Sequence, residues 1–247
     1  MRITLFKCLV IFIYNIGIAH ADNRAIKLSF CFEAWQPFAY LNKQGEAVGE
    51  HIAFLKSVLE PYGSQLSFHD MPFRRCLKEV KQGHIDFIMH VDETDGVQLI
   101  DHPMGYWELL LAYKDKSSRR KIENKDSKIL VSRDYAYPKP VIDKLDSMSV
   151  QIVTESFYTN TPYEVKKLFK LVESGFVDAI LVDKAWAKYE LSKQEINVVL
   201  DDQLFYSQPY YFGYVKGNEE KANFLLSVLL SVKGTKKEVP HTSNNTY

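Results

Sequence analysis

The apolar positions of the chain alternate between the spacing of strands and the spacing of helices. Short apolar runs with β-branched and aromatic residues predict three strands in the first part of the chain: 27–32, 65–73 and 84–91. Apolar residues at helical spacing, closed by glycine, predict two helices between them: 51–63 and 74–83. This order of elements is typical of a parallel sheet with covering helices.

A second series of the same kind follows a charged connector at 114–128. Acids alternate with bases in the connector, so we interpret it as solvated and not as a nucleic-acid-binding tail. Beyond it the pattern predicts four strands and four helices. The strands are the first part of 128–137, which continues as a loop, and 149–156, 177–183 and 196–201; the helices are 138–146, 161–175, 184–193 and 219–234. Two similar halves joined by polar segments predict a cleft, with the ligand bound by loops that follow strands.

The first 21 residues are predicted to be a cleavable signal peptide. Arg2 and Lys7 give a positive start, residues 9–18 are almost wholly apolar, and Ala-His-Ala at 19–21 has the small-x-small pattern of a cleavage site. The apolar run is shorter than the ~20 residues that span a membrane. We therefore expect an exported protein that matures in the periplasm, with an uncleaved anchor as the alternative.

Charge and motif content narrow the function classes. Removal of the peptide leaves 29 basic and 31 acidic residues, because it takes away two bases and no acid. This balance gives no basic face for a nucleic acid and no patch for a membrane surface. The sequence contains no His-x-x-x-His or Cys-x-x-Cys spacing, no Gly-x-Ser-x-Gly and no P-loop, so we expect no metal, no cofactor and no enzyme of those classes.

Two cysteines remain after removal of the peptide, which takes Cys8 with it. Cys31 and Cys76 form either a disulfide or two separate buried thiols in an oxidising compartment. The sequence leaves both alternatives open.

Four segments, in order, resemble the family-3 extracellular solute-binding proteins of amino-acid ABC transporters. They are AWQPFAYLNKQGEAVGE at 34–50, LKEVKQGHIDFIMHV at 77–91, KLFKLVESGFVDAILVD at 167–183 and PYYFGYVKGNEEKANFLLSVLLSVKGT at 209–235. Each motif is weak alone, and the ordered set, which covers nearly the whole mature chain, is more specific.

The resemblance implies an α/β protein with the two-lobed periplasmic-binding-protein-like II fold. Each lobe would be a mostly parallel sheet flanked by helices. Lobe I would comprise 22–111 plus 205–240 and lobe II 112–204, and 241–247 would be a flexible tail. Closure would occur about two crossing strands, near 110–114 and 200–206. Both cysteines would then lie in lobe I on neighbouring strand ends, which favours the disulfide.

The resemblance also implies ligand-binding positions on both lobes. Trp35 matches an aromatic residue that stacks on the ligand, although a core tryptophan is the simpler alternative. Asp183 matches the acid that pairs with a substrate ammonium, and it is also a suitable N-cap for the helix that follows. Arg133 falls in the loop that receives the substrate carboxylate, and Tyr135 beside it offers a hydroxyl or a ring face.

Other candidates follow strand ends. Of Arg74 and Arg75, one is expected to face the cleft, and we assign Arg75 to it. Ser156 is expected to line lobe II, with a plain turn as the alternative. His90 and Asp92 lie where the family carries an arginine that binds the carboxylate. Because acids replace that arginine, the ligand is predicted to be cationic, or its anionic end to be held by Arg133 or Arg75.

The predicted function is capture of a small polar solute, amino-acid-like or cationic, by hinge closure. We expect a monomer that delivers the solute to an ABC permease. A periplasmic sensor or adaptor that signals to a membrane partner is the alternative. A dehydratase-type enzyme on the same fold ranks lower, since fold alone does not decide function.

Overall fold

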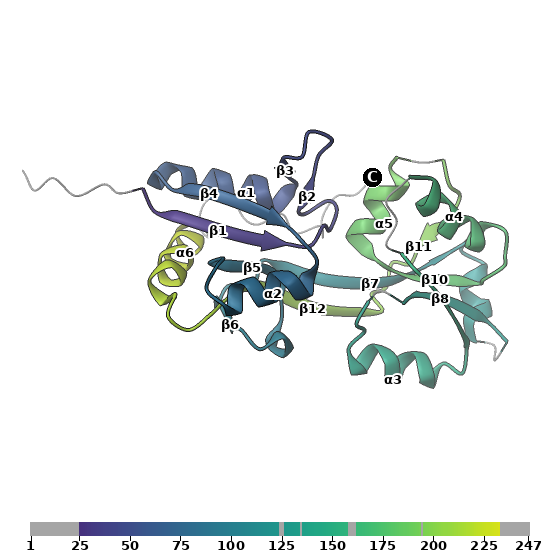
Figure 1. The fold of residues 1–247 in the computed structure, drawn as a ribbon. Helices are drawn as coiled ribbons and strands as arrows, with labels where there is room; N and C mark the ends of the chain where they lie inside the picture. The colour runs from purple at the N-terminus through teal and green to yellow at the C-terminus, as the bar shows by residue number, and fades with distance from the viewer. Residues whose placement is uncertain (1–24, 124–125, 134, 158–161, 194, 233–247) are drawn as a thin grey trace, which may run out of the picture.

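The computed structural model describes residues 25–123, 126–133, 135–157, 162–193 and 195–232. The predicted signal peptide and C-terminal tail lie outside the described residues. Figure 1 shows two α/β bodies connected by two long strands, β7 (Gly105–Tyr113) and β12 (Tyr206–Tyr214). The sheet runs in the order β4-β1-β5-β12-β7-β10-β8-β9. No helix among the described residues is long and apolar enough to cross a membrane.

Lobe I is built on three parallel strands, β1 (Lys27–Phe32), β4 (Gln65–Asp70) and β5 (Phe87–Val91). Its helices are α1 (Glu50–Leu59), α2 (Phe73–Lys81) and α6 (Glu219–Val232). Alternate residues of β1 face opposite sides of the sheet. Phe30 and Phe32 pack against α1 and α6, whereas Cys31 packs against α2.

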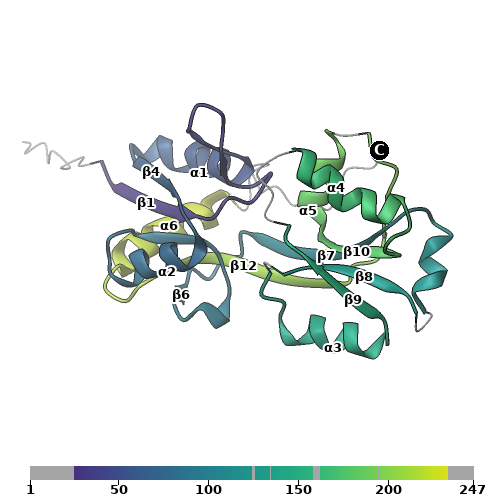
Figure 2. The same cartoon turned by 45° about the vertical axis from the view of Figure 1, so that its right-hand side comes forward.

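Lobe II repeats this arrangement around three parallel strands, β8 (Lys128–Ser132), β9 (Gln151–Glu155) and β10 (Ala179–Asp183). Its helices are α3 (Lys139–Ser147), α4 (Pro162–Glu173) and α5 (Lys184–Leu191). Ile180 and Val182 pack against α4 and α5, whereas Leu181 packs against α3. Figure 2 shows α3 on one side of these strands and α4 with α5 on the other.

The crossing strands overlap the predicted segments only in part. Residues 105–109 of β7 pair antiparallel with 206–210 of β12, so most of the crossing lies outside the predicted segments. β12 then runs antiparallel to β5 in lobe I, and β7 runs antiparallel to β10 in lobe II. The parallel strands of each lobe are therefore joined by an antiparallel pair. The hydrophobic cores of the two lobes remain separate clusters on either side of that pair.

The remaining elements are short. They are β2 (Tyr40–Leu41), β3 (Ala47–Val48), η1 (Glu60–Tyr62), η2 (Glu93–Asp95), β6 (Gln98–Leu99), η3 (Ser118–Glu123) and β11 (Val199–Leu200). The predicted strand at 196–201 is thus reduced to β11, which pairs with β7. The charged connector is not wholly solvated, because Ile122 in η3 is buried in the core of lobe II.

Gly49 fixes how α1 approaches the loop that follows β1. Its φ of 118° is a conformation that favours glycine, and a Cβ atom there would overlap the backbone carbonyl of Phe38. The backbone N–H of His51 donates to that same carbonyl at 3.0 Å. The first turn of α1 is therefore held against residues 34–39, which lead into the site described next.

Cys31 and Cys76 are joined by a disulfide, with their Cα atoms 5.7 Å apart. The bridge links β1 to the first turns of α2, so Cys76 lies on a helix and not on the strand end that the resemblance implied. Cys31 stands two residues before Glu33, and Cys76 stands two residues after Arg74. Both of these charged residues lie on the cavity wall described next.

Candidate functional site

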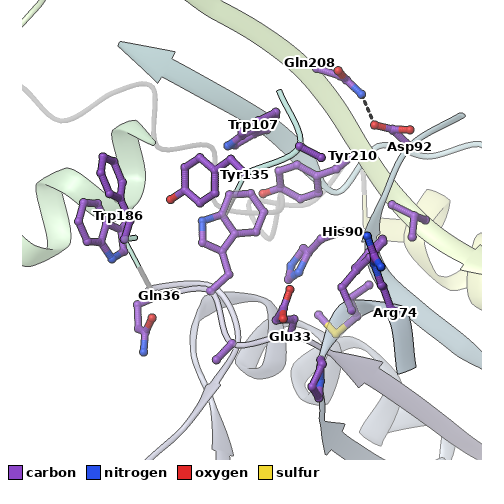
Figure 3. A pocket seen from close by; sticks show the side chains of 18 of the residues that line it. Glu33, Gln36, Arg74, His90, Asp92, Trp107, Tyr135, Trp186, Gln208 and Tyr210 are labelled. Carbon is purple, nitrogen blue, oxygen red and sulfur yellow. Dashed lines mark hydrogen bonds between the residues drawn. The ribbon is translucent and has the colours of Figure 1, made fainter. Parts of the chain in front are cut away.

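A cavity of about 680 Å³ lies between the two lobes and against the crossing strands. Ligand sites for small molecules have volumes of about 300–1,000 Å³. The cavity is therefore large enough for an amino acid or a somewhat larger solute. Figure 3 shows that the labelled side chains converge on it from both lobes.

The wall formed by lobe I is polar and charged. It comes from the loop after β1, the start of α2 and the end of β5, and its polar members are Glu33, Gln36, Arg74, His90 and Asp92. Arg74 has no hydrogen bond or ion pair with any residue that the structure describes. Its guanidinium is therefore available to bind an anion, and its planar donors suit a carboxylate.

The wall formed by lobe II is aromatic. Tyr135, Phe157 and Trp186 line it, and none of the lining residues described in this lobe carries a charge. Trp186 is stacked between Phe157 and Phe169, with ring centroids 6.2 and 5.8 Å away. This packing holds the ring of Trp186 in place. The wall offers flat apolar surface that can pack on a solute or attract a cation.

The crossing strands supply the third side of the cavity. Trp107 comes from β7, and Gln208, Pro209 and Tyr210 come from β12. These side chains stand where the two lobes meet. A solute in the cavity would therefore touch the strands that connect the lobes.

Trp35, predicted from the resemblance, lies on the cavity wall. Its ring makes edge contacts with Phe38, His90 and Tyr210 at centroid distances of 4.8, 4.9 and 5.1 Å. Its indole N–H also faces the carboxylate of Asp183 in lobe II and lowers the pKa of that group, although less than burial raises it. Trp35 thus faces the cavity and contacts the opposite lobe at the same time.

Asp183 is buried and does not line the cavity, contrary to its predicted contact with the ligand. Its side chain is the N-cap of α5 and accepts a hydrogen bond from the backbone N–H of Trp186 at 2.6 Å. Trp35 covers the same carboxylate from lobe I. The residue is 1 % exposed, and burial raises the pKa of its carboxyl to about 7.

Replacement of Asp183 by asparagine is expected to change how stability depends on pH. The folded carboxyl titrates near pH 7 and the unfolded one near its usual value of 3.8, so the folded state binds more protons between these values. The free energy of unfolding of the parent therefore falls as the pH rises through this window. Asparagine keeps the cap and does not titrate. Urea unfolding from about pH 5 to about pH 8 should show Asp183→Asn gaining about 2 kcal/mol on the parent. A difference that is constant across pH would contradict this assignment.

His90, Asp92 and Tyr135 line the cavity as predicted residues. Both carboxylate oxygens of Asp92 already have partners, because one accepts from Thr94 and the other from Gln208 at 2.5 Å. Figure 3 shows the contact with Gln208. Asp92 therefore caps η2 and fixes Gln208, and little of its charge remains for a solute.

Arg75, Arg133 and Ser156 are not among the lining residues. Arg75 lies next to Arg74 on α2, and consecutive helical residues point about 100° apart, so only one of the pair can face the cavity. The charge of Arg75 acts on Glu79, one turn further along the helix. Arg133 is exposed and donates to the carbonyl oxygen of Thr154 at 3.2 Å. Ser156 is exposed beside Phe157, which does line the cavity.

The sequence interpretation missed most of the aromatic residues and the parts of the crossing strands that line the cavity. Trp186 follows the predicted Asp183 by three residues, which on a helix brings it to the same end. Trp107 and Tyr210 lie on the crossing strands but outside the segments predicted for them, 110–114 and 200–206. The sequence feature that could have identified these two residues is an aromatic side chain near the start of a strand that connects the lobes. No group of metal-binding side chains occurs within the described residues.

Comparison with known proteins agrees with this geometry. Residues 28–98 match the model of the bacterial extracellular solute-binding proteins, family 3, and no curated protein matches the chain. The fold matches a probable amino-acid ABC transporter extracellular-binding protein from Bacillus subtilis, with a TM-score of 0.71, 14 % identity and coverage of 85 % of this chain and 92 % of that one.

Two ancestral proteins also match in fold. An ancestral arginine-binding protein bound to arginine gives a TM-score of 0.64 at 22 % identity, covering 86 % of this chain and 94 % of that one. An ancestral amino-acid-binding protein, a precursor of cyclohexadienyl dehydratase, gives 0.62 at 20 % identity, covering 86 % and 91 %. The structural matches show the two-lobed type II periplasmic-binding fold. The match of residues 28–98 to the family model agrees with the family resemblance expected from the sequence.

Proposed function

We propose that the protein, whose residues 28–98 match the model of the family-3 extracellular solute-binding proteins, captures a small polar solute between its lobes. The observation that carries this proposal is the cavity, whose walls allow one solute to touch lobe I, lobe II and the crossing strands together. A solute that contacts both lobes stabilises the closed form by its difference in affinity for the two forms. An ABC permease in the membrane would then receive the solute from the closed form.

The chemistry of the walls supports an amino-acid-like solute with an anionic end and a side chain that packs on rings. Arg74 is the group available for the anionic end. Glu33 lines the same wall and can attract an ammonium group. The rings of Tyr135, Phe157 and Trp186 can pack on an apolar side chain or attract a cationic one. Arg74 therefore takes the role that the sequence interpretation gave to Arg133 or Arg75.

We infer that the protein does no chemistry on this solute. Glu33, His90 and Asp92 are the lining groups that could transfer protons. Both oxygens of Asp92 accept hydrogen bonds from the protein. Burial lowers the pKa of His90 to about 3, so its ring is a weak base at neutral pH. A solute that is recovered unchanged after incubation with the protein, by chromatography, would agree with this inference.

A thermal-shift screen tests the proposed function. The panel contains acidic, basic, neutral and aromatic amino acids, polyamines, small peptides and organic acids. We expect one chemical class to raise Tm, by roughly 5–10 °C at a concentration of about 100 Kd. The enantiomer of each active amino acid serves as a control for non-specific effects of charge. A panel in which no member raises Tm would contradict the proposal.

A further inference from the structure

Strand β5 contains an irregularity at the point where it reaches the cavity. Val91 pairs with Tyr211 and Ile88 pairs with Gly213, so two residues of β5 stand opposite one residue of β12. Within this bulge His90 has a φ of 63°, in the left-handed region that few residues other than glycine adopt. The bulge interrupts the alternation of side chains along β5. It thereby turns the ring of His90 toward α1 and the cavity.

The ring of His90 is held by aromatic and polar contacts. Trp35 and Tyr210 each meet it nearly perpendicular, with ring centroids 4.9 and 5.3 Å away. Its Nε2 atom lies 2.9 Å from Nδ1 of His51, which is fully buried at the start of α1. Nε2 of His51 lies 3.4 Å from the hydroxyl of Tyr210. Tyr210, His51 and His90 therefore form one hydrogen-bonded chain, called the relay below.

The tautomers of the relay follow from the direction of its hydrogen bonds. In the direction that begins with Tyr210, the hydroxyl donates its hydrogen bond to Nε2 of His51. A neutral histidine that accepts at Nε2 carries its own proton on Nδ1. His51 therefore donates from Nδ1 to Nε2 of His90. By the same rule His90 carries its proton on Nδ1.

The Nδ1 atom of His90 is open to the cavity. Among the described residues, the buried side-chain nitrogen and oxygen atoms all have partners except Oγ of Ser64. No described residue bonds to Nδ1 of His90, so this atom is not sealed in the core, and His90 lines the cavity. Figure 3 shows His90 and Arg74 on the same side of the cavity, across from Trp186.

We propose that His90 donates a hydrogen bond from Nδ1 to an oxygen atom of the bound solute, and that Tyr210 and His51 fix the tautomer that makes this possible. Arg74 lies on the same wall, so the oxygen belongs to a carboxylate or a similar oxyanion. The inference rests on the proposed function and narrows it to solutes that present such a group. His90 supplies a neutral donor where a second arginine would have supplied a charge.

The members of the relay stay neutral over the pH range in which proteins function. Burial holds the pKa of both histidines below the usual value of 6.5, to about 3 for His90. Burial, together with the charges of Asp183, Glu50 and Glu108, holds the pKa of the Tyr210 hydroxyl well above 10. The hydroxyl therefore keeps its proton, and both imidazole rings keep one proton each. A Cβ atom at Gly105 would lie 2.5 Å from that hydroxyl, so the absence of a side chain at this position makes room for the hydroxyl of Tyr210.

Nuclear magnetic resonance of histidine-labelled protein without ligand tests the relay directly. Nitrogen-15 spectra distinguish a protonated ring nitrogen from an unprotonated one. We expect His51 and His90 each to be protonated on Nδ1 and unprotonated on Nε2. Tyr210→Phe removes the donor to His51, so a measurable fraction of His51 and His90 should change to the opposite tautomer. Tyr211→Phe, which removes a neighbouring hydroxyl outside the relay, should leave both tautomers unchanged.

The contact with an oxyanion is tested with sodium acetate as the probe and methylammonium chloride as a control. Acetate should shift the Nδ1 resonance of His90 in a saturable manner, and methylammonium chloride should not. His90→Phe keeps a ring against Trp35 and should lower acetate affinity by about tenfold, the loss of one hydrogen bond to a charged group.

Three results would overturn the inference: protonation of His90 on Nε2, tautomers that do not respond to Tyr210→Phe, or equal shifts from the two salts. The tautomers are measured without ligand, so the result of this test does not depend on the solute screen. A correct relay in a protein that binds no member of the panel would refute the proposed function instead.

Discussion

Replacement of Arg74 by alanine is expected to weaken binding of a carboxylate-bearing solute by about 2–4 kcal/mol, roughly 30- to 1,000-fold in Kd. Arg74 lines the cavity and has no partner among the described residues, so its guanidinium is the cation that an anionic group would meet. Closure of the lobes removes water from this contact and strengthens it. Isothermal titration calorimetry of the active solute from the thermal-shift screen measures the loss.

Arg75→Ala is the matched control for this prediction. It removes the same charge from the same helix, one residue away, and leaves the cavity wall unchanged. We expect its affinity to lie within about twofold of the parent, because surface charges contribute little. Arg74→Lys should recover part of the affinity, since it restores the charge without the planar pair of donors. Equal losses from Arg74→Ala and Arg75→Ala would show that only net charge matters and would refute the assigned contact.

Removal of the disulfide is expected to produce the largest loss of stability. The bridge between Cys31 and Cys76 closes a loop with a sequence separation of 45 residues. By the entropy of loop closure, the double variant Cys31→Ala, Cys76→Ala should lose about 4 kcal/mol of the free energy of unfolding. Guanidinium unfolding of the oxidised parent and the variant measures this difference.

The same variant should also bind its solute more weakly. Glu33 follows β1 and Arg74 lies on α2, and each stands two residues from a bridged cysteine, so the bridge limits the distance between the two charges. Reduction of the parent with a phosphine should lower its stability to that of the variant, and the variant itself should not respond to the reductant. A parent whose unfolding midpoint does not change on reduction would contradict the structural role of the bridge.

The lobes were predictable because their strands and helices carry complete local signals. β1, β8 and β10 are short buried runs, and α1 and α4 have one apolar face, so the period of apolar residues identifies them. The crossing strands carry a weaker signal. Residues 105–109 and 206–210 mix exposed, half-buried and buried positions, since they belong to no single core. The prediction therefore placed the crossing a few residues away, at 110–114 and 200–206.

The site was predictable only in part because helix phase and capping are decided by tertiary contacts. The sequence indicated an arginine at the start of α2, but the choice between Arg74 and Arg75 depends on the rotation of that helix against the sheet. Asp183 fits a cap and a ligand equally well in sequence, and its contact with Trp35 across the lobes is not visible there. The bulge that turns His90 likewise arises from its pairing with β12.

A crystal structure of the protein with the solute that gives the largest thermal shift tests the central claim most directly. We expect the solute to occupy the cavity between the lobes, with an oxyanion at Arg74 and His90 and its remaining atoms against the rings of Phe157 and Trp186. A solute that binds on an outer surface and does not occupy the cavity between the lobes would contradict the account.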